Sequence, residues 1–343
     1  MNYIITTISA VFVFGLVIFI HEFGHYSTAK KNGIRVNEFS IGMGPLLWSK
    51  QKGETLYSLR LLPIGGYCAM EGEEEESDAP GSFSKASVPA RLAVVAAGAR
   101  NNILLGVAVL CLLTVFGGNI ASTTVAGFYD NALTESTGLM QNDRILSVNG
   151  SRLYIANDLF YEMMWVKDGK CDMKVVRDGN TILLKDVTFN TVENDDGTNT
   201  IQLDFYVYAI NKNPITIIKH VVLWTLSLTR QILRGLYQLI TGVVPLNSLS
   251  GPVGIVSVIG EAAGLGLDSL LLILAYISIN LGIMNVMPLP ALDGGKIIGL
   301  IIEGLTGNKP SEKMEIIINA VGLVLLLGIM IFATYNDVMR LIK

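Results

Sequence analysis

The motif His21-Glu22-Phe23-Gly24-His25 closes the apolar run from Ile8 to Ile20 instead of lying on a water-soluble helix, so its ionisable groups are expected inside a membrane. Residues four apart share one face of an α-helix, so His21 and His25 can offer ring nitrogens to one metal ion. Glu22 lies about 100° further round, where it can reach a water at that metal. Ionisable groups in an apolar span are costly unless they serve a polar cavity, which favours a zinc hydrolase over an accidental helix end.

Composition places the chain among integral membrane proteins that carry a water-soluble insert. Hydrophobic residues make up 51% of the sequence and charged residues only 16%. The net charge of -4 is spread out without a basic stripe, so no nucleic-acid binding is expected. Cys68, Cys111 and Cys171 are widely spaced and predict packing residues instead of a disulfide framework. No cleavable signal peptide is expected, so the first span should be retained.

The first domain, residues 1–34, is expected to be a membrane span that carries the His-Glu motif. Its apolar run must borrow from His21 to Ala29 to cross the hydrocarbon, so the motif should lie just inside one membrane face. Lys30, Lys31 and Arg35 follow the span, whereas no Lys or Arg precedes it. The positive-inside rule therefore predicts an extracytoplasmic N-terminus and an active site that opens toward the cytoplasm.

Residues 35–89 are expected to form a cytoplasmic-side sheet and an acidic loop. Glycines that include Gly42 and Gly44 punctuate short runs around a polar turn at residues 50–54, which indicates β-hairpins. An edge strand there could receive an extended substrate by β-addition, or the hairpins could only plug the helix bundle, and the pattern does not separate the two. Glu73-Glu74-Glu75-Glu76 is expected to be a solvated loop.

A second span is expected over residues 90–118, followed by a soluble α+β domain over residues 119–211. Residues 138–145, Gly-Leu-Met-Gln-Asn-Asp-Arg-Ile, and the following Val148-Asn149-Gly150 resemble a PDZ domain. Asp178-Gly179 between two strand-like runs predicts a tight hairpin. Such domains commonly receive a chain end by strand addition, and a steric gate that keeps bulky proteins out is the equal alternative.

Residues 212–268 are expected to hold an amphipathic helix on the outer membrane surface and a tight turn at Gly251-Pro252-Val253-Gly254-Ile255. If that helix crossed the membrane, the next span would deliver Asp293 to the face opposite His21. Residues 269–343 should then supply the third and fourth spans, with the Leu-Asp-Gly-Gly motif between them.

A third metal ligand is expected near the end of the third span, because zinc in hydrolases takes three protein ligands and leaves one position open. Pro288 and Pro290 break the helix there, and the freed backbone should line the interior. Asp293 lies in this break at the depth of the two histidines, although an aspartate that caps the next helix is the alternative. The other carboxylates near the membrane are Glu261, Asp268 and Glu303.

The chain resembles the site-2 protease family, and within it the bacterial regulators of sigma-factor activity of the RseP and RasP type. The resemblance rests on residues 21–25, the Ala97-Gly98 to Asn102 stretch, the PDZ-like insert, residues 251–255 and Asn285-Val286-Met287-Pro288-Leu289-Pro290-Ala291-Leu292-Asp293-Gly294-Gly295. It implies His21, His25 and Asp293 as ligands of Zn2+, and Glu22 as the catalytic base. Ala99 departs from the family, which often has proline after Ala-Gly.

The resemblance also implies the function. The expected fold is a polytopic α-helical membrane protein with about four spans, a re-entrant β-hairpin region and an extracytoplasmic PDZ-like domain. The expected substrates are single-span proteins of the bacterial plasma membrane, cut within or next to the bilayer, with a site-1-type protease acting upstream. Asn285, Gly42, Gly44, Pro288 and Pro290 are the expected substrate-binding residues. The alternative is an inactive scaffold or a metal-handling protein, which the lack of paired inverted segments disfavours.

Overall fold

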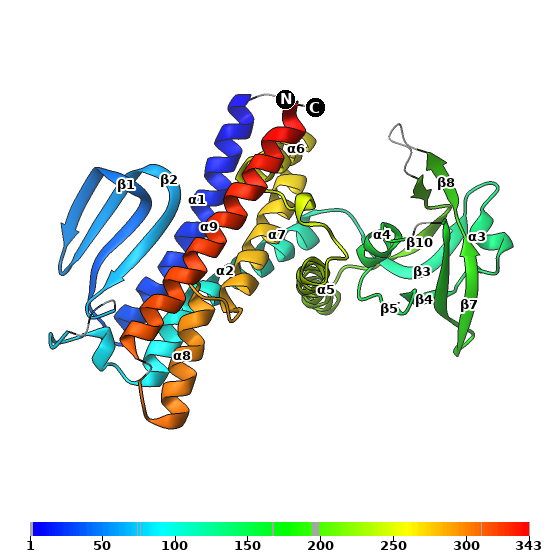
Figure 1. Cartoon of the computed structure of the whole chain (residues 1–343). Helices are drawn as coiled ribbons and strands as arrows, with labels where there is room; N and C mark the ends of the chain where they lie inside the picture. The colour runs from blue at the N-terminus through cyan, green and yellow to red at the C-terminus, as the bar shows by residue number, and fades with distance from the viewer. Residues whose placement is uncertain are drawn as a thin grey trace. The chain divides into compact units, whose positions relative to one another are not determined.

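The computed structural model describes residues 3–73, 75, 77–166, 168–193, 199–309 and 311–342, so Glu74 and Glu76 of the acidic run lie outside the described residues. The chain divides into two compact units (Figure 1). The first comprises Met1–Leu110 and Gln231–Lys343, and the second comprises Cys111–Arg230.

Apolar helices dominate the first unit. In the described part of the chain, four helices are long and apolar enough to cross a membrane, as expected from the sequence. They are α1 (Tyr3–Lys31), α2 (Val88–Phe116), α7 (Leu267–Val286) and α9 (Glu312–Ile342), the last with its apolar part at Ile316–Arg340. The protein is therefore a multi-pass membrane protein.

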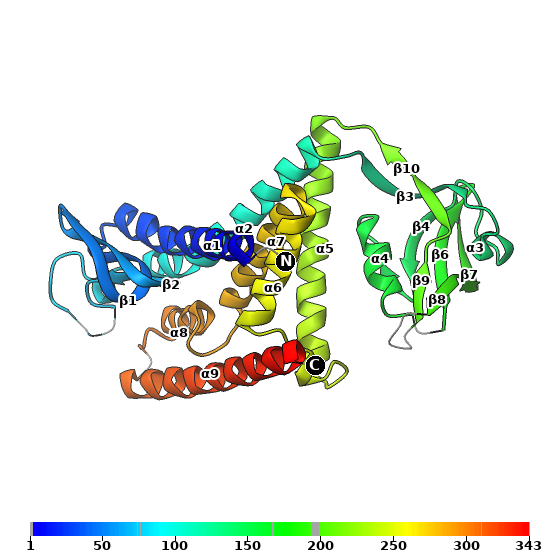
Figure 2. The same ribbon diagram turned by 90° about the horizontal axis from the view of Figure 1, so that it is seen from above.

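Helix α6 corrects one expectation. Gly251 to Ile255 do not make a tight turn, because α6 (Pro252–Leu265) begins at Pro252. Proline suits the first position of a helix, where its missing N–H would have no intrahelical partner. Figure 2 shows α6 beside α1 and α7, and an added Cβ on Gly260 of α6 would lie 2.5 Å from the Thr6 hydroxyl of α1. A small residue therefore lets these two helices approach closely.

The sheet that follows α1 is a long antiparallel hairpin, β1 (Val36–Lys52) and β2 (Thr55–Met70), folded on itself. Glu38 pairs with both Leu56 and Ala69, so the start of β1 lies between the two halves of β2. Gly42 and Gly44 have φ angles of 82° and 83°, and this left-handed backbone makes the bend in β1. The expected hairpins are present, and their entry into the membrane stays a prediction.

The second unit is an α+β domain whose main sheet has the order β10-β3-β4-β6-β7. Its elements are β3 (Ile120–Phe128), α3 (Leu133–Ser136), β4 (Arg144–Val148), β5 (Ser151–Arg152), α4 (Asn157–Met163), β6 (Lys170–Arg177), β7 (Asn180–Thr188), β8 (Asn190–Glu193), β9 (Asn199–Gln202) and β10 (Phe205–Ile210). Asp178 and Gly179 form the predicted β6–β7 turn, with φ angles of 49° and 80°. Burial raises the pKa of the Cys171 thiol to about 12, as suits a packing residue.

The stretch that resembles a PDZ domain is anchored by one buried carboxylate. Asp143 has no exposed surface and accepts hydrogen bonds from Arg177 Nε at 2.8 Å and from the Met140 amide at 2.9 Å. Asn142 takes the left-handed conformation, which asparagine adopts more readily than most residues, with φ at 72°. Helix α5 (Pro214–Ile240) leaves this domain and is not among the four candidate spans, and its place at the membrane surface stays a prediction.

Candidate metal centre

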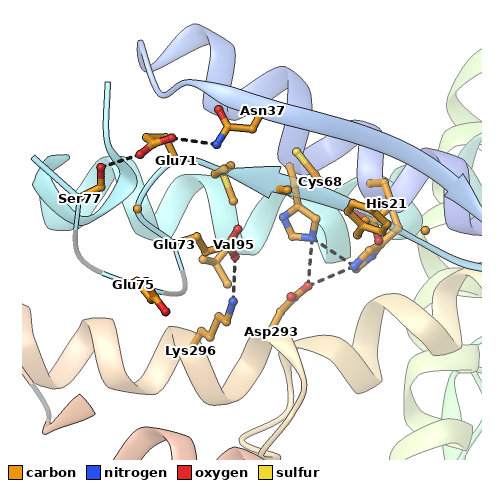
Figure 3. Close-up of a pocket in the computed structure, with 17 residues that line it drawn as sticks. His21, Asn37, Cys68, Glu71, Glu73, Glu75, Ser77, Val95, Asp293 and Lys296 are labelled. Carbon is orange, nitrogen blue, oxygen red and sulfur yellow. Dashed lines mark hydrogen bonds and ion pairs between the residues drawn. The ribbon is translucent and has the colours of Figure 1, made fainter. Parts of the chain in front are cut away.

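Three ligand atoms from two distant parts of the chain converge at the end of α1. His21 and His25 lie on one face of α1, and their Nε2 atoms are 3.2 Å apart. Asp293 Oδ2 lies 3.2 Å from His21 Nε2 and 3.4 Å from His25 Nε2 (Figure 3). Within the described ranges, these residues form the single cluster of metal-ligand type, with the candidate donor atoms within 4.8 Å of one another.

The hydrogen-bond partners of the Nδ1 atoms of both histidines suit a cluster that binds a cation through the Nε2 atoms. His25 Nδ1 donates to the carbonyl of Val94 at 2.9 Å, which leaves the Nε2 lone pair facing the cluster. The Asn102 amide lies 3.2 Å from His21 Nδ1, and a carboxamide can present its oxygen to an Nδ1 proton. Asp293 Oδ2 is buried and has no hydrogen-bond donor among the described residues. Three converging lone pairs repel one another unless a cation lies between them, so the donor set fits zinc.

A close crossing of α1 and α2 makes room for the two rings. An added Cβ on Gly98 would lie 2.4 Å from His25 Nε2 and 2.6 Å from His21 Cε1. A Cβ on Gly24 would lie 2.3 Å from the carbonyl oxygen of Ala97. Both glycines are therefore required for the geometry of the histidine pair.

The loop before α8 (Asp293–Thr306) presents the carboxylate. Leu292 occupies the helix N-cap, so Asp293 does not cap α8 with its side chain and is free to face the histidines. Ala291 has a φ angle of 65° and donates its amide to Asn319 Oδ1 of α9 at 3.2 Å. A Cβ on Gly294 would lie 1.8 Å from the Met287 oxygen. Glycine at this position allows the chain to double back against the end of α7.

Glu22 and the three candidate ligand residues open into a pocket of about 760 Å³. Residues 66–70, the second half of β2, form one wall of this pocket. An added Cβ on Gly66 would lie 3.2 Å from Glu22 Cγ and 2.8 Å from the Ser40 oxygen, so the strand touches Glu22 closely. The pocket thus brings together the Glu22 carboxylate, a candidate metal site and an extended strand.

The acidic run is part of this pocket and not only a solvated loop. Glu73 pairs with Lys296 of α8 at 2.8 Å, and its side chain is only 18% exposed (Figure 3). Glu71 accepts hydrogen bonds from Asn37 and Ser77, at 2.9 Å and 2.6 Å. The segment after β2 is therefore tied both to the sheet and to the helix that begins at Asp293.

The five residues expected to bind substrate do not line this pocket. The lining residues in the described part of the chain include none of Asn285, Gly42, Gly44, Pro288 and Pro290. Asn285 is 7% exposed and lies within α7, whereas Pro290 packs closely against Gly322 of α9. Their contact with a substrate stays a prediction, and the contact of Pro290 with Gly322 supports the loop that carries Asp293.

Sequence reasoning missed three features of the site. Gly98 was noticed only as part of the family resemblance, and the contacts of Gly98 and Asn102 with the histidines depend on how α1 crosses α2. The strand at residues 66–70 was one of several glycine-punctuated runs.

Glu303, one of the other candidate carboxylates, forms a two-point ion pair with Arg91 of α2, at 2.6 Å and 2.9 Å.

Comparison with known proteins agrees with this geometry. The model of peptidase family M50 matches residues 9–329, and the chain therefore belongs to that family. It is a zinc metalloprotease. A Clostridium perfringens protein named as a zinc metalloprotease is 34% identical to this chain, over 96% of this chain and 98% of that protein. The regulator of sigma-W protease RasP of Bacillus subtilis is 28% identical, over 98% of this chain and 99% of its own length.

Proposed function

We propose that this protein is an intramembrane zinc endopeptidase that cuts single-span membrane proteins within or next to their membrane segment, as a step of regulated intramembrane proteolysis. The observation that carries the proposal is the convergence of His21, His25 and Asp293 at the end of a helix that is apolar and long enough to span a bilayer. A hydrolytic centre at that depth has the membrane-embedded part of another chain as its nearest substrate.

His21, His25 and Asp293 hold the zinc, and Glu22 moves the protons. When bound, zinc supplies Lewis-acid chemistry, because it polarises the scissile carbonyl and lowers the pKa of water. Glu22, in the same pocket, accepts the proton of the attacking water and returns it to the leaving amine. The Val94 carbonyl and the Asn102 amide keep both imidazoles in the orientation that binding needs.

The edge of the folded hairpin holds the substrate. Residues 66–70 pair with residues 36–41 on one side, and within the described residues their other side carries no strand. That open side belongs to the wall of the pocket that contains Glu22. A transmembrane helix must unwind before its carbonyls can be attacked, which is costly in lipid. Pairing of the freed backbone with residues 66–70 offsets that cost by strand addition.

Local unwinding predicts a dependence on helix-breaking residues in the substrate. Replacement of Gly or Pro by Leu in the span of a substrate should slow its cleavage, because the helix then resists opening. The measurement is the initial rate with a matched pair of reporters that differ only at those positions. Equal rates for the pair would count against the unwinding step.

The domain between the first two and the last two spans selects substrates by size. With α1 oriented by Lys30 and Lys31, residues 120–210 lie outside the cytoplasm. A partner with a large outer domain, such as an anti-sigma factor, then needs an upstream protease to trim it. Deletion of residues 120–210 should let an untrimmed reporter be cut. If the deletion variant retains zinc but leaves the untrimmed reporter intact, the result would favour active docking of substrates by this domain.

The direct test uses purified protein in detergent with a single-span reporter, and maps the cut by mass spectrometry. We expect a cut inside or beside the apolar segment, abolished by a zinc chelator and restored by added zinc. A cut that persists in chelator would reject the assignment of this chemistry to the protein. Bound zinc without any cut, for several reporters, would favour the metal-handling alternative.

A further inference from the structure

A second pocket lies against the opposite face of α1. On that helix, Phe19 and Phe23 lie about half a turn away from the two histidines, and Tyr26 lies about a third of a turn away. They form one wall of a groove of about 580 Å³. The other wall comes from β1 and β2, chiefly Phe39, Trp48, Lys50, Lys52 and Tyr57.

Aromatic contacts build the floor of this groove. The ring of Tyr26 lies 5.2 Å from that of Phe39 and 6.0 Å from that of Tyr57, and the two tyrosine hydroxyls are 2.5 Å apart. Phe19 adds an edge-on contact with Phe39 at 6.1 Å. Such mutually packed rings hold the groove open as a fixed apolar surface between helix and sheet.

The groove has an apolar end and a basic end. The tip of the hairpin is tied to the end of α1 by the ion pair of Lys30 with Glu54. Lys50 and Lys52 lie next to that tip, on the same face of β1 as Trp48 because side chains alternate along a strand. In the part of the chain that the structure describes, neither Lys50 nor Lys52 forms an ion pair. The positively charged side chains of Lys50 and Lys52 therefore lie unpaired, among the described residues, where α1 reaches the membrane surface.

We propose that this groove binds a phospholipid with an anionic headgroup. One acyl chain lies along Phe19, Phe23 and Trp48, and the phosphate lies at Lys50 and Lys52. Anionic lipids are attracted to lysines beside the membrane surface, and aromatic rings suit the headgroup level. Trp48 is 54% exposed, so the groove is open on the side of Trp48.

The charge of the groove favours an anionic lipid over a substrate helix as its occupant. On the orientation proposed above, the basic end of the groove faces the cytoplasm, where membrane spans carry their own Lys and Arg. Lys50 and Lys52 would repel that end of a substrate, whereas they attract a lipid phosphate. The lipid would also join α1, which carries His21 and His25, to the sheet that forms the wall of the catalytic pocket.

The test measures contact of Trp48 with brominated lipid in the full chain. Trp165 and Trp224 are the other two tryptophans, and neither lines the groove, so their replacement by Phe leaves Trp48 as the reporter. Quenching is compared in nanodiscs of phosphatidylcholine that contain either brominated phosphatidylglycerol or brominated phosphatidylcholine. We expect preferential quenching by the anionic lipid, with about a fivefold loss of preference for each of K50Q and K52Q.

The matched control is K31Q, which removes an exposed charge at the end of α1 outside the groove and should keep the preference. Zinc content of each variant reports whether it is folded. Equal quenching by the two lipids, or a preference that K50Q and K52Q leave unchanged, overturns the proposal. Relief of quenching by an added single-span segment would identify the groove as a substrate site and also overturn it.

Discussion

The side-chain amide of Asn102 lies 3.2 Å from Nδ1 of His21, and Asn102 has no exposed surface. Its position is fixed from α7, because Ser278 Oγ donates to the backbone carbonyl of Asn102 at 2.7 Å. A partner of this kind sets the orientation and the tautomer of a metal-binding imidazole. We therefore propose that Asn102 is a positioning residue that acts through His21, one of the proposed zinc ligands.

Asn102→Leu should weaken zinc binding by about 10- to 100-fold, the usual effect of losing such a partner. The measurement is zinc retention against a graded series of chelator concentrations. Cleavage by Asn102→Leu should recover at high zinc, which a general folding defect would not allow. Asn101→Leu is the control, since Asn101 contacts Arg100 and the Ile20 carbonyl instead of a ligand. Equal zinc retention by both variants would refute the role of Asn102.

Gly98→Ala should abolish zinc binding. The new methyl group would lie within 2.4 Å of His25 Nε2, and α2 cannot retreat without opening its crossing with α1. Gly15→Ala is the matched control, because Gly15 also lies within a membrane helix and has nothing within 4 Å of an added Cβ. Zinc content after purification separates the two, and normal zinc in Gly98→Ala would contradict the close crossing of α1 and α2.

Gly66→Ala should lower the cleavage rate while zinc stays bound. The added methyl group meets Glu22 Cγ at 3.2 Å and the Ser40 oxygen at 2.8 Å, so it displaces either the base or the edge strand. Displacement of a catalytic group by about 1 Å can cost about 100-fold in rate. Gly118→Ala, where nothing lies within 4 Å, should cleave at the normal rate. Parallel zinc loss in Gly66→Ala would show that the strand supports the ligands instead.

Arg91→Met should destabilise the helix bundle by about 3–5 kcal/mol, because it leaves the Glu303 carboxylate buried without its partner. The two side chains are only 9% and 11% exposed. The double variant Arg91→Met with Glu303→Met should regain most of the lost stability, since no buried charge remains. Denaturant titration in mixed micelles measures both. A double variant no more stable than the single one would argue against this ion pair as the cause.

Local sequence signals predicted the elements of this protein, and tertiary contacts decided the details of the site. The Asp178-Gly179 turn and the four apolar spans follow from short-range rules, so they could be predicted. The start of α6 was missed because proline fits both a turn and the first residue of a helix. The pairing of Glu73 with Lys296 joins residues 223 apart in sequence, which no periodicity reveals.

The first measurement to make is cleavage and zinc content of Glu22→Gln beside the wild type, with the same single-span reporter. Glutamine has nearly the shape of glutamate but cannot accept the proton of water at neutral pH. We predict that wild type cuts within the span, whereas Glu22→Gln binds zinc equally well and does not cut. Cleavage by Glu22→Gln at the wild-type rate would contradict the proposed role of Glu22 and, with it, the proposed mechanism.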